Sequence, residues 1–200
     1  MKNYLCINGK KTELTKEQMK QLGIVQEPIA TISADGKTAK IGDYEFIVLK
    51  NDKTLGTVEL LLKNSLKTMS FGSNNDYRKS DVRKVVEDFG HTIEEIVGAE
   101  NLIEHTVDLV ALSGLKDFGC ITAKMSLLTF DKARENIDTL DENKLDSFWW
   151  LATPLSTKKH DIEYSVMCVS PRGRLGDRNS DCSCNGVRPF CILKSTIFQS

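Results

Sequence analysis

The segment between Tyr164 and Leu193 constrains the fold of this chain most. It holds two runs of strand-forming residues, Tyr164 to Ser170 and Val187 to Leu193, separated by a polar stretch that contains several Arg and Gly residues. Runs of β-branched and aromatic residues favour strands, and polar Gly-containing stretches between them favour turns. We therefore predict that the two runs are hydrogen-bonded neighbours in one curled sheet, with the polar stretch between them projecting into solvent.

The rest of the chain predicts an α+β fold, with helices in the middle and strands at both ends. Ser80 is expected to cap a helix with an apolar stripe from Val82 to Phe89, and a second short helix is expected to end at Gly98. Thr129 is expected to cap a further helix. Strands are expected at 29–32, 40–41, 44–49, 58–62, 106–112, 125–128 and 148–152, and a polar turn at 141–144. A mixed curled sheet that joins the two ends of the chain accommodates this order.

The first 26 residues form an element distinct from the domain predicted over 27–200. Asn8-Gly9 lies between two short semi-apolar runs, which is a strong signal for a tight β-hairpin. Thr15 stands three residues before Gln18, the spacing of a capping box, and a short helix is expected to follow it. A hairpin and two helical turns bury too little surface to be stable alone. We expect this element to dock on the domain or to mediate attachment or homo-oligomerisation.

Composition excludes several classes of function. Hydrophobic residues make up 40% of the 200 residues, and the formal net charge is -1 with the basic residues scattered. This balance gives no reason to expect nucleic acid as a partner. No window approaches the about 20 apolar residues of a membrane span, so we expect no membrane insertion. The start lacks the pattern of a signal peptide, which predicts a chain made in the cytoplasm.

The sequence contains no recognisable set of catalytic or cofactor-binding residues, so we expect neither an enzyme nor a bound cofactor. His91, His105 and His160 are too widely spaced for a local zinc site, and each is expected to be a surface or hydrogen-bonded core histidine. Cys182 and Cys184 are separated by one residue, which does not suit a tetrahedral ion, so they are interpreted as an incidental pair of loop thiols. The kinase-like tripeptide at 117–119 has no accompanying kinase motifs and is interpreted as coincidence.

The polar stretch from Arg172 to Asn185 carries the candidate ligand-binding residues. Its side chains donate and accept hydrogen bonds in many geometries, and guanidinium groups are effective anchors at recognition surfaces. The candidate residues are Arg172, Arg174, Asp177, Arg178, Asn179, Asp181, Ser183 and Asn185. An ordinary flexible hairpin loop is the alternative interpretation of the same residues.

Several motifs together resemble a family of phage, prophage and gut-bacterial proteins with a C-type-lectin-like fold. This family is related to formylglycine-generating enzymes and to the variable proteins of diversity-generating retroelements. The motifs are 149–154, 166–169 followed by Arg172-Gly173, 186–190, 71–75, 80–83 and 126–129. The resemblance covers roughly residues 41–198. It implies that Trp149 or Trp150 packs in the core and that Arg188 is a structural hydrogen-bond hub.

The resemblance implies three functions. The first is a non-enzymatic binding protein whose loop recognises a protein or glycan. In retroelement-diversified relatives such a loop varies by adenine-targeted mutation, which from Asn codons cannot generate Lys, Glu, Gln, Met or Trp, and residues 172–185 contain none of these. The second is a cysteine-dependent metalloenzyme like the formylglycine-generating enzymes, although the cysteines here do not match that family's pair. The third is a phage inhibitor of a host defence enzyme. Calcium-dependent sugar binding is not implied, because its signature motifs are absent.

Overall fold

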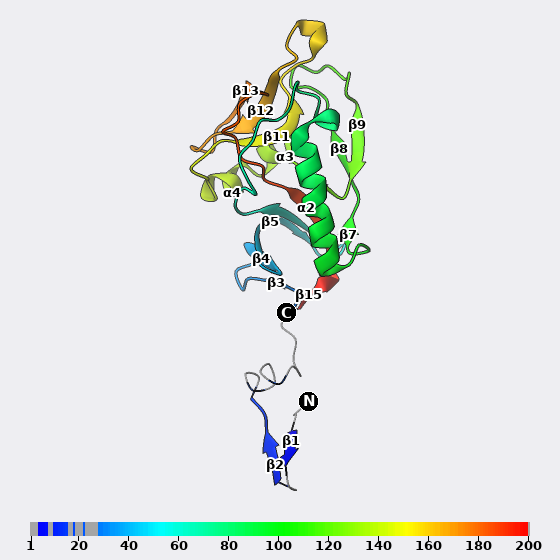
Figure 1. Ribbon diagram of the computed structural model, residues 1–200, viewed down its shortest axis with the longest axis vertical. Coiled ribbons are helices and arrows are strands. Elements are labelled where there is room, and N and C mark those ends of the chain that lie inside the picture. Colours follow the sequence, from blue (N-terminus) through cyan, green and yellow to red (C-terminus); the bar gives the residue numbers. More distant parts are fainter. Residues whose placement is uncertain (1–3, 8–9, 16–17, 19–21, 23–27, 200) are drawn as a thin grey trace.

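The computed structural model describes residues 4–7, 10–15, 18, 22 and 28–199 (Figure 1). The predicted hairpin is confirmed: β1 (Tyr4–Ile7) pairs antiparallel with β2 (Lys10–Glu13). The capping box is also present, because the Thr15 backbone N–H donates to Gln18 Oε1 at 3.0 Å and the Gln18 N–H donates to Thr15 Oγ1 at 3.2 Å. Most of the short helix predicted after this cap lies outside the described residues.

The largest sheet joins strands from both ends of the domain. Its strands run in the order β10 (Met125–Ser126), β14 (Phe190–Lys194), β6 (Thr57–Leu62), β5 (Tyr44–Asp52), β4 (Thr38–Ile41), β3 (Ala30–Ile32) and β15 (Phe198–Gln199), with β7 (Leu102–Ile103) beside β14. All pairs are antiparallel except β15 with β3, so the sheet is mixed, as predicted. Figure 1 shows the carboxy-terminal end of the chain beside β3.

A second sheet of three strands contains the first of the two late runs, Tyr164 to Ser170, and part of the polar stretch that follows it. It is formed by β11 (Trp149–Pro154), β12 (Ser165–Val169) and β13 (Leu175–Asn179), in that order and antiparallel. The prediction that the two late runs pair with each other is wrong, because β12 pairs with β11 and β13 whereas β14 pairs with β6, β7 and β10. A further pair, β8 (His105–Asp108) and β9 (Cys120–Ala123), lies at the side.

One long helix replaces the two helices predicted between 80 and 98. The helix α2 (Asp81–Val97) begins after Ser80, whose side chain accepts from the Arg83 N–H, and it ends at Gly98. Gly90 does not break it but lets it approach β10, since a Cβ at Gly90 would lie 3.3 Å from the Met125 Cβ. As predicted, Thr129 caps α3 (Phe130–Glu135). The helix α4 (Ile137–Glu142) takes in half of the predicted polar turn.

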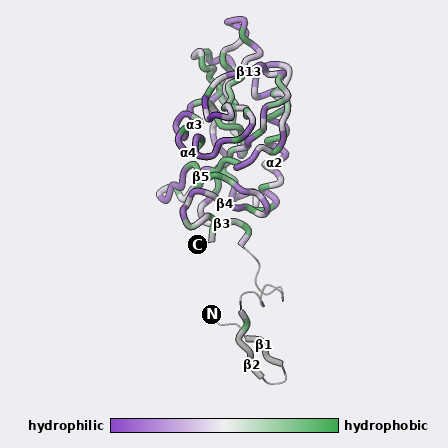
Figure 2. Tube along the Cα trace, turned by 90° about the vertical axis from the view of Figure 1, so that its left-hand side faces the viewer, coloured by the Kyte–Doolittle hydropathy of each residue, from purple (hydrophilic) through white to green (hydrophobic). Residues whose placement is uncertain are grey.

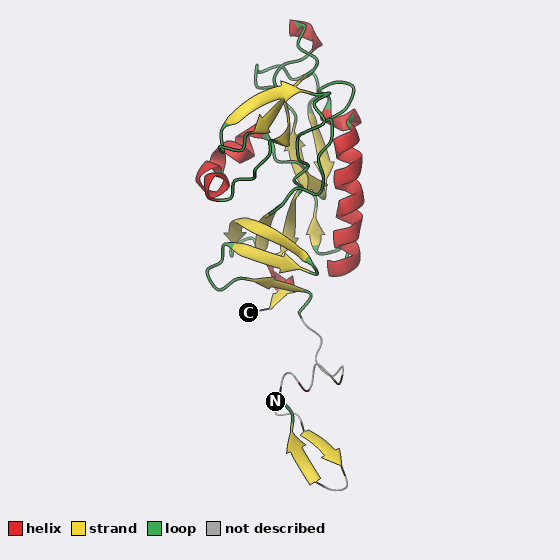
Figure 3. Cartoon of the chain, turned by 60° about the vertical axis from the view of Figure 1, so that its left-hand side comes forward, coloured by secondary structure: helices red, strands yellow, loops and turns green. Residues whose placement is uncertain are grey.

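Short 3-10 turns complete the described elements at Tyr77–Lys79 (η1), Lys158–His160 (η2) and Ser195–Ile197 (η3). Figure 3 shows α2 along one side of the sheets and the smaller α3 and α4 on another. The domain therefore has the predicted α+β class. None of the described helices is long and apolar enough to cross a membrane.

The strand β11 divides the interior into two apolar clusters. Trp150 packs into the larger one, between the main sheet and α2, and Trp149 packs into the smaller one, which includes residues of α3 and α4. Both indoles are buried, which confirms that they pack in the core. Figure 2 shows hydrophobic chain running through the interior around β5, while hydrophilic chain lies at the outline near α3 and α4.

Candidate functional site

The predicted recognition segment is divided by the structure into a turn, a strand and a buried return. Residues 170–174 form a tight turn, in which the Gly173 N–H donates to the Ser170 carbonyl at 2.9 Å and the Ser170 N–H donates to the Arg174 carbonyl at 2.9 Å. Gly173 has φ 76°, a conformation that glycine adopts without strain. The strand β13 follows the turn. Its Gly and charged residues concealed it from sequence analysis, but β13 is an edge strand, where such residues are tolerated.

The candidate residues of the segment do not share one surface. Arg172 and Arg174 are exposed in the turn, and Asp177 and Asn179 are exposed on β13. Asp181 and Ser183 are exposed in the loop that follows β13. The turn, the strand β13 and the loop after it are therefore three separate exposed sites, not one recognition surface.

Arg178 and Asn185 have structural contacts. The guanidinium carbon of Arg178 lies 3.6 Å from the centroid of the Phe148 ring, a cation–π contact. Asn185 is fully buried, and its carbonyl accepts from the Met69 N–H at 3.0 Å. Ser180 and Val187 accept in the same way from Phe71 and Leu66. Ser180 and residues 185–189 therefore run into the interior against residues 62–71, whereas Asp181, Ser183 and Cys184 between them stay exposed.

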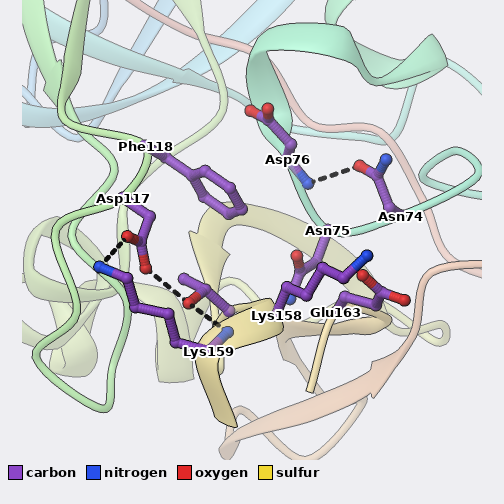
Figure 4. A pocket seen from close by; sticks show the side chains of 9 residues that line it. Asn74, Asn75, Asp76, Asp117, Phe118, Lys158, Lys159 and Glu163 are labelled. Atoms are coloured by element: carbon purple, nitrogen blue, oxygen red, sulfur yellow. Dashed lines mark hydrogen bonds and ion pairs between the residues drawn. The ribbon is translucent and has the colours of Figure 1, made fainter. Parts of the chain in front are cut away.

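A hollow of about 510 Å³ lies near η2, at the opposite end of the domain from the carboxy terminus (Figures 1 and 4). It is lined by Asn74, Asn75, Asp76, Asp117, Phe118, Thr157, Lys158, Lys159 and Glu163. These residues come from three loops: the one before η1, the one between β8 and β9, and the one between β11 and β12. We call this hollow the three-loop pocket. None of the candidate residues predicted from the sequence lines it.

Asn75 holds two of these loops together. Its side chain is buried, and its amide nitrogen donates to the carbonyls of Ser156, Ile162 and Ser165 at 2.9, 3.1 and 3.1 Å. Its backbone N–H donates to the Glu163 carbonyl at 2.9 Å. An amide nitrogen has two N–H groups, so three such carbonyls occupy it fully. Asn75 therefore fixes the path of the β11–β12 loop, which supplies four of the lining residues.

The carboxylates of Asp76 and Asp117 are each paired with a cation. Asp76 accepts from Arg78 Nε and Nη2, both at 2.8 Å. Burial alone would raise the pKa of Asp76, but the hydrogen bonds and charge of Arg78 outweigh it and lower the pKa. Asp117 pairs with Lys159 and accepts from Thr157 Oγ1 at 2.6 Å, and these two contacts lower its pKa. Figure 4 shows Asp117 linked to Lys159 along one wall.

The ring of Phe118 is the aromatic surface of the three-loop pocket. Its side chain is half-buried against the larger apolar cluster. The guanidinium carbon of Arg78 lies 5.1 Å from the ring centroid, so Arg78 bridges Asp76 and Phe118. In Figure 4 the ring lies between Asp117 and Asp76. Lys158 and Glu163 also line the pocket, and within the described chain neither of them forms an ion pair.

A second hollow of about 340 Å³ adjoins the first. It is lined by Asp161, Ile162, Glu163, Tyr164, Ser165, Asp177 and Asn179. Glu163 lines both hollows. Its carboxylate raises the pKa of the exposed Tyr164 hydroxyl, which shows that the two groups lie close together. Asp177 and Asn179 are the only two of the eight candidate residues that line either hollow.

Comparison with known proteins gives a family for the chain. Residues 94–195 match the family described as a domain of unknown function (DUF6273). The chain belongs to this DUF6273 family. The DUF6273 match takes in two of the three pocket loops and all of the three-stranded sheet, and it begins after the loop that carries Asn75. No curated protein and no solved structure matches the chain.

Sequence reasoning missed the lining of the three-loop pocket in this DUF6273 chain. Phe118 stands within the kinase-like tripeptide, which was interpreted as coincidence, and Lys158 and Lys159 are among the basic residues that were described as scattered. A single aromatic residue inside a polar, Gly-flanked loop was the one local signal available. His91, His105 and His160 lie apart, and in the described part of the chain no group of three or more His, Cys, Asp or Glu residues is placed to hold a metal ion.

Proposed function

We propose that this chain is a non-enzymatic binding module and that the three-loop pocket accepts a sugar ring of a glycan. The observation that carries the proposal is the pocket itself, which combines one aromatic ring with amide, carboxylate and ammonium groups around it. Its volume of about 510 Å³ lies within the usual range for sites that bind small ligands. A site of this size fits a sugar unit better than a folded protein surface, which needs a larger and flatter contact area.

The charges around the pocket favour a ligand with no net charge. Asp76 and Asp117 are neutralised by Arg78 and Lys159. The two remaining charged groups, Lys158 and Glu163, have opposite signs. A phosphate or a polycation would meet no matching excess of charge here, because specific sites for such ligands depend on clustered charges of the opposite sign.

The side chains around the pocket match the surface of a sugar. A pyranose has an apolar C–H face and a rim of hydroxyl groups that both donate and accept hydrogen bonds. Phe118 offers an aromatic surface for the C–H face. Asn74 and Glu163 offer acceptors, and Asn74 and Lys158 offer donors, for the rim. The adjoining hollow, with Asp177, Asn179 and Tyr164, would take a second sugar unit.

The arrangement of the domain supports the further proposal of a C-type-lectin-like fold from a phage or prophage source. Strands from the beginning and the end of the domain pair in one sheet, and a small second sheet, β11–β12–β13, carries the loops. Both features accord with the motifs that resemble that family. Under this proposal the polar segment contributes Asp177 and Asn179 to recognition, in place of a single projecting loop.

Binding is tested first with saturation-transfer NMR, using the methyl glycosides of glucose, galactose and mannose and of their N-acetylated counterparts, and then with an immobilised glycan array. The wild type should bind at least one of them. Phe118→Ala should weaken that binding by about tenfold or more, equivalent to roughly 1.4 kcal/mol. Leu55→Ala, an exposed apolar truncation in the β5–β6 turn, is the control and should bind normally.

A second pair of variants distinguishes the loss of a lysine that lines the pocket from the loss of a lysine elsewhere on the surface. Lys158→Ala should reduce glycan binding, whereas Lys116→Ala, which removes an exposed lysine from a pocket-forming loop but not from the lining, should not. The melting temperature of every variant should stay close to that of the wild type. Absence of binding by the wild type to every glycan would reject the proposal, and so would wild-type affinity in Phe118→Ala.

A further inference from the structure

Two cysteine thiols lie side by side in the loop after β13. The sulfur atoms of Cys182 and Cys184 are 2.9 Å apart. Cys184 is exposed and Cys182 is half-buried, so a small reagent can reach this loop. By contrast, Cys168 and Cys191 are buried, and burial raises the pKa of each to about 12. Cys120 is an exposed thiol on β9 that serves as an internal comparison.

We propose that Cys182 and Cys184 form a dithiol that exchanges with low-molecular-weight disulfides such as glutathione disulfide. The site stands apart from the three-loop pocket, since neither cysteine lines either hollow. The proposal therefore does not depend on the glycan proposal.

The surroundings of Cys182 favour its thiolate. The two thiols lie within hydrogen-bonding distance of each other, and Arg178 Nη1 lies 3.8 Å from the Cys182 sulfur. The hydrogen bond from Cys184 and then the guanidinium of Arg178 lower the pKa of Cys182, whereas the same neighbour raises the pKa of Cys184. Both sulfurs also lie 3.7 Å from Asn185 Oδ1, which is held in place by its buried backbone. One sulfur is thus the nucleophile and the other keeps its proton.

The exchange proceeds in two balanced steps. The Cys182 thiolate attacks one sulfur of the disulfide, the S–S bond of the reagent breaks, and one thiol leaves after taking up a proton. Cys184 then loses its proton and attacks the Cys182 sulfur of the mixed disulfide, and the second thiol leaves. The protein gives up two electrons and two protons, and one molecule of disulfide becomes two molecules of thiol.

Arg178 connects this pair to the sheet. It lies on β13, and its guanidinium is held over the Phe148 ring, which fixes its distance from Cys182. Arg178 is therefore a positioning residue for the dithiol. The backbone N–H of Cys182 also donates to the Asn179 carbonyl at 3.0 Å, so the pair begins immediately after the end of the strand.

The test uses the full chain, reduced and then freed of reductant, in graded mixtures of reduced and oxidised glutathione. After acid quenching and alkylation, mass spectrometry of the peptide from Asn179 to Lys194 should show the loss of two hydrogens and a disulfide between Cys182 and Cys184. Cys184→Ser should stop at a mixed disulfide on Cys182. Cys182→Ser should form a mixed disulfide on Cys184 about tenfold more slowly, because the activated thiolate is gone.

The role of Arg178 is tested by the pH dependence of alkylation. The wild-type rate at Cys182 should rise with pH at lower values than the rate at Cys120. Arg178→Ala should move the Cys182 profile to higher pH, and Arg178→Lys should restore part of the shift by returning the charge. Cys182 reacting no faster than Cys120, or glutathione remaining on wild-type Cys182 without an internal disulfide, would overturn the proposal. So would stoichiometric copper or zinc retained by the pair in reduced protein.

Discussion

The turn at 170–174 and the return at 185–189 both lie between β12 and β14, and they have opposite surroundings. The turn carries Arg172 and Arg174, both exposed. The return carries Arg188, which is fully buried although it is the same residue type. The difference comes from the backbone hydrogen bonds. Those of the return join it to residues 62–71, whereas those of the turn join residues of the turn to one another. Polarity alone does not say which part of such a segment meets solvent.

Arg188 shows what burial of the return entails. Its Nε donates to the Leu62 carbonyl at 2.7 Å, and its guanidinium carbon lies 5.0 Å from the Trp149 ring centroid. Its terminal nitrogens have no hydrogen-bond partner in the described part of the chain. Burial lowers the pKa of Arg188 to about 10. At neutral pH the group is charged in both the folded and the unfolded state, so its desolvation opposes folding there in full.

The largest effect on stability is expected at Arg188. Arg188→Ala removes the hydrogen bond to Leu62 and leaves a cavity beside Trp149, and we expect it to lower the free energy of unfolding by about 2–4 kcal/mol. Arg188→Met fills most of the same volume without the charge and should cost about 1 kcal/mol or less. Chemical denaturation of both variants gives the comparison. Equal stability of Arg188→Ala and the wild type would mean that the return is no more constrained than the turn.

The linkage between pH and stability has a definite sign at Arg188. Its folded pKa of about 10 lies below its unfolded value, so in the window from pH about 10 up to the unfolded pKa the unfolded chain binds more protons than the folded one. The contribution of this group therefore makes the wild type more stable as pH rises through that window. Arg188→Met lacks this contribution, and the difference in unfolding free energy between it and the wild type should shift in favour of the wild type across the window.

A smaller effect is expected at Gly186, where the return touches the opposite segment most closely. A Cβ at Gly186 would lie 2.1 Å from Ser65 Oγ and 2.8 Å from Ser65 Cβ. Gly186→Ala should therefore destabilise the fold by about 1–3 kcal/mol. Ser65→Gly removes both clashing atoms, and a double-mutant cycle should show that the two changes together cost less than their sum. Additive costs would show that the return does not pack against Ser65.

Much of the fold follows from local sequence signals. The strands at 44–52 and 57–62 each contain a cluster of apolar residues, and Ser80 and Thr129 cap helices where the spacing predicted them. β13 was not found, because Gly176, Asp177 and Asn179 have low strand propensity and form a strand only through pairing with β12. The prediction of two helices between 80 and 98 was wrong, because α2 continues through Gly90, where it packs closely against Met125.

The candidate site was less accessible to sequence reasoning. The three-loop pocket is assembled from segments that are far apart in the chain, and no single segment carries its pattern. Asn75 holds the β11–β12 loop by hydrogen bonds to backbone carbonyl groups. Because every residue type has such a carbonyl, the sequence of that loop does not indicate the contact. The predicted segment lies beside the site, and it meets the site only where Asp177 and Asn179 line the adjoining hollow.

The smallest effect on stability is expected in the turn. Arg172 and Arg174 are exposed, and Arg174 joins the turn through its backbone: its N–H donates to Ser170 Oγ at 3.1 Å and its carbonyl accepts from the Ser170 N–H at 2.9 Å, and both contacts survive truncation to Ala. Arg172→Ala with Arg174→Ala should change the free energy of unfolding by less than about 0.5 kcal/mol. Because neither residue lines a hollow, glycan binding by this double variant should equal that of the wild type. Loss of binding with unchanged stability would instead assign recognition to the turn, in agreement with the single exposed loop predicted from the sequence. The three-loop pocket would then no longer be the proposed binding site.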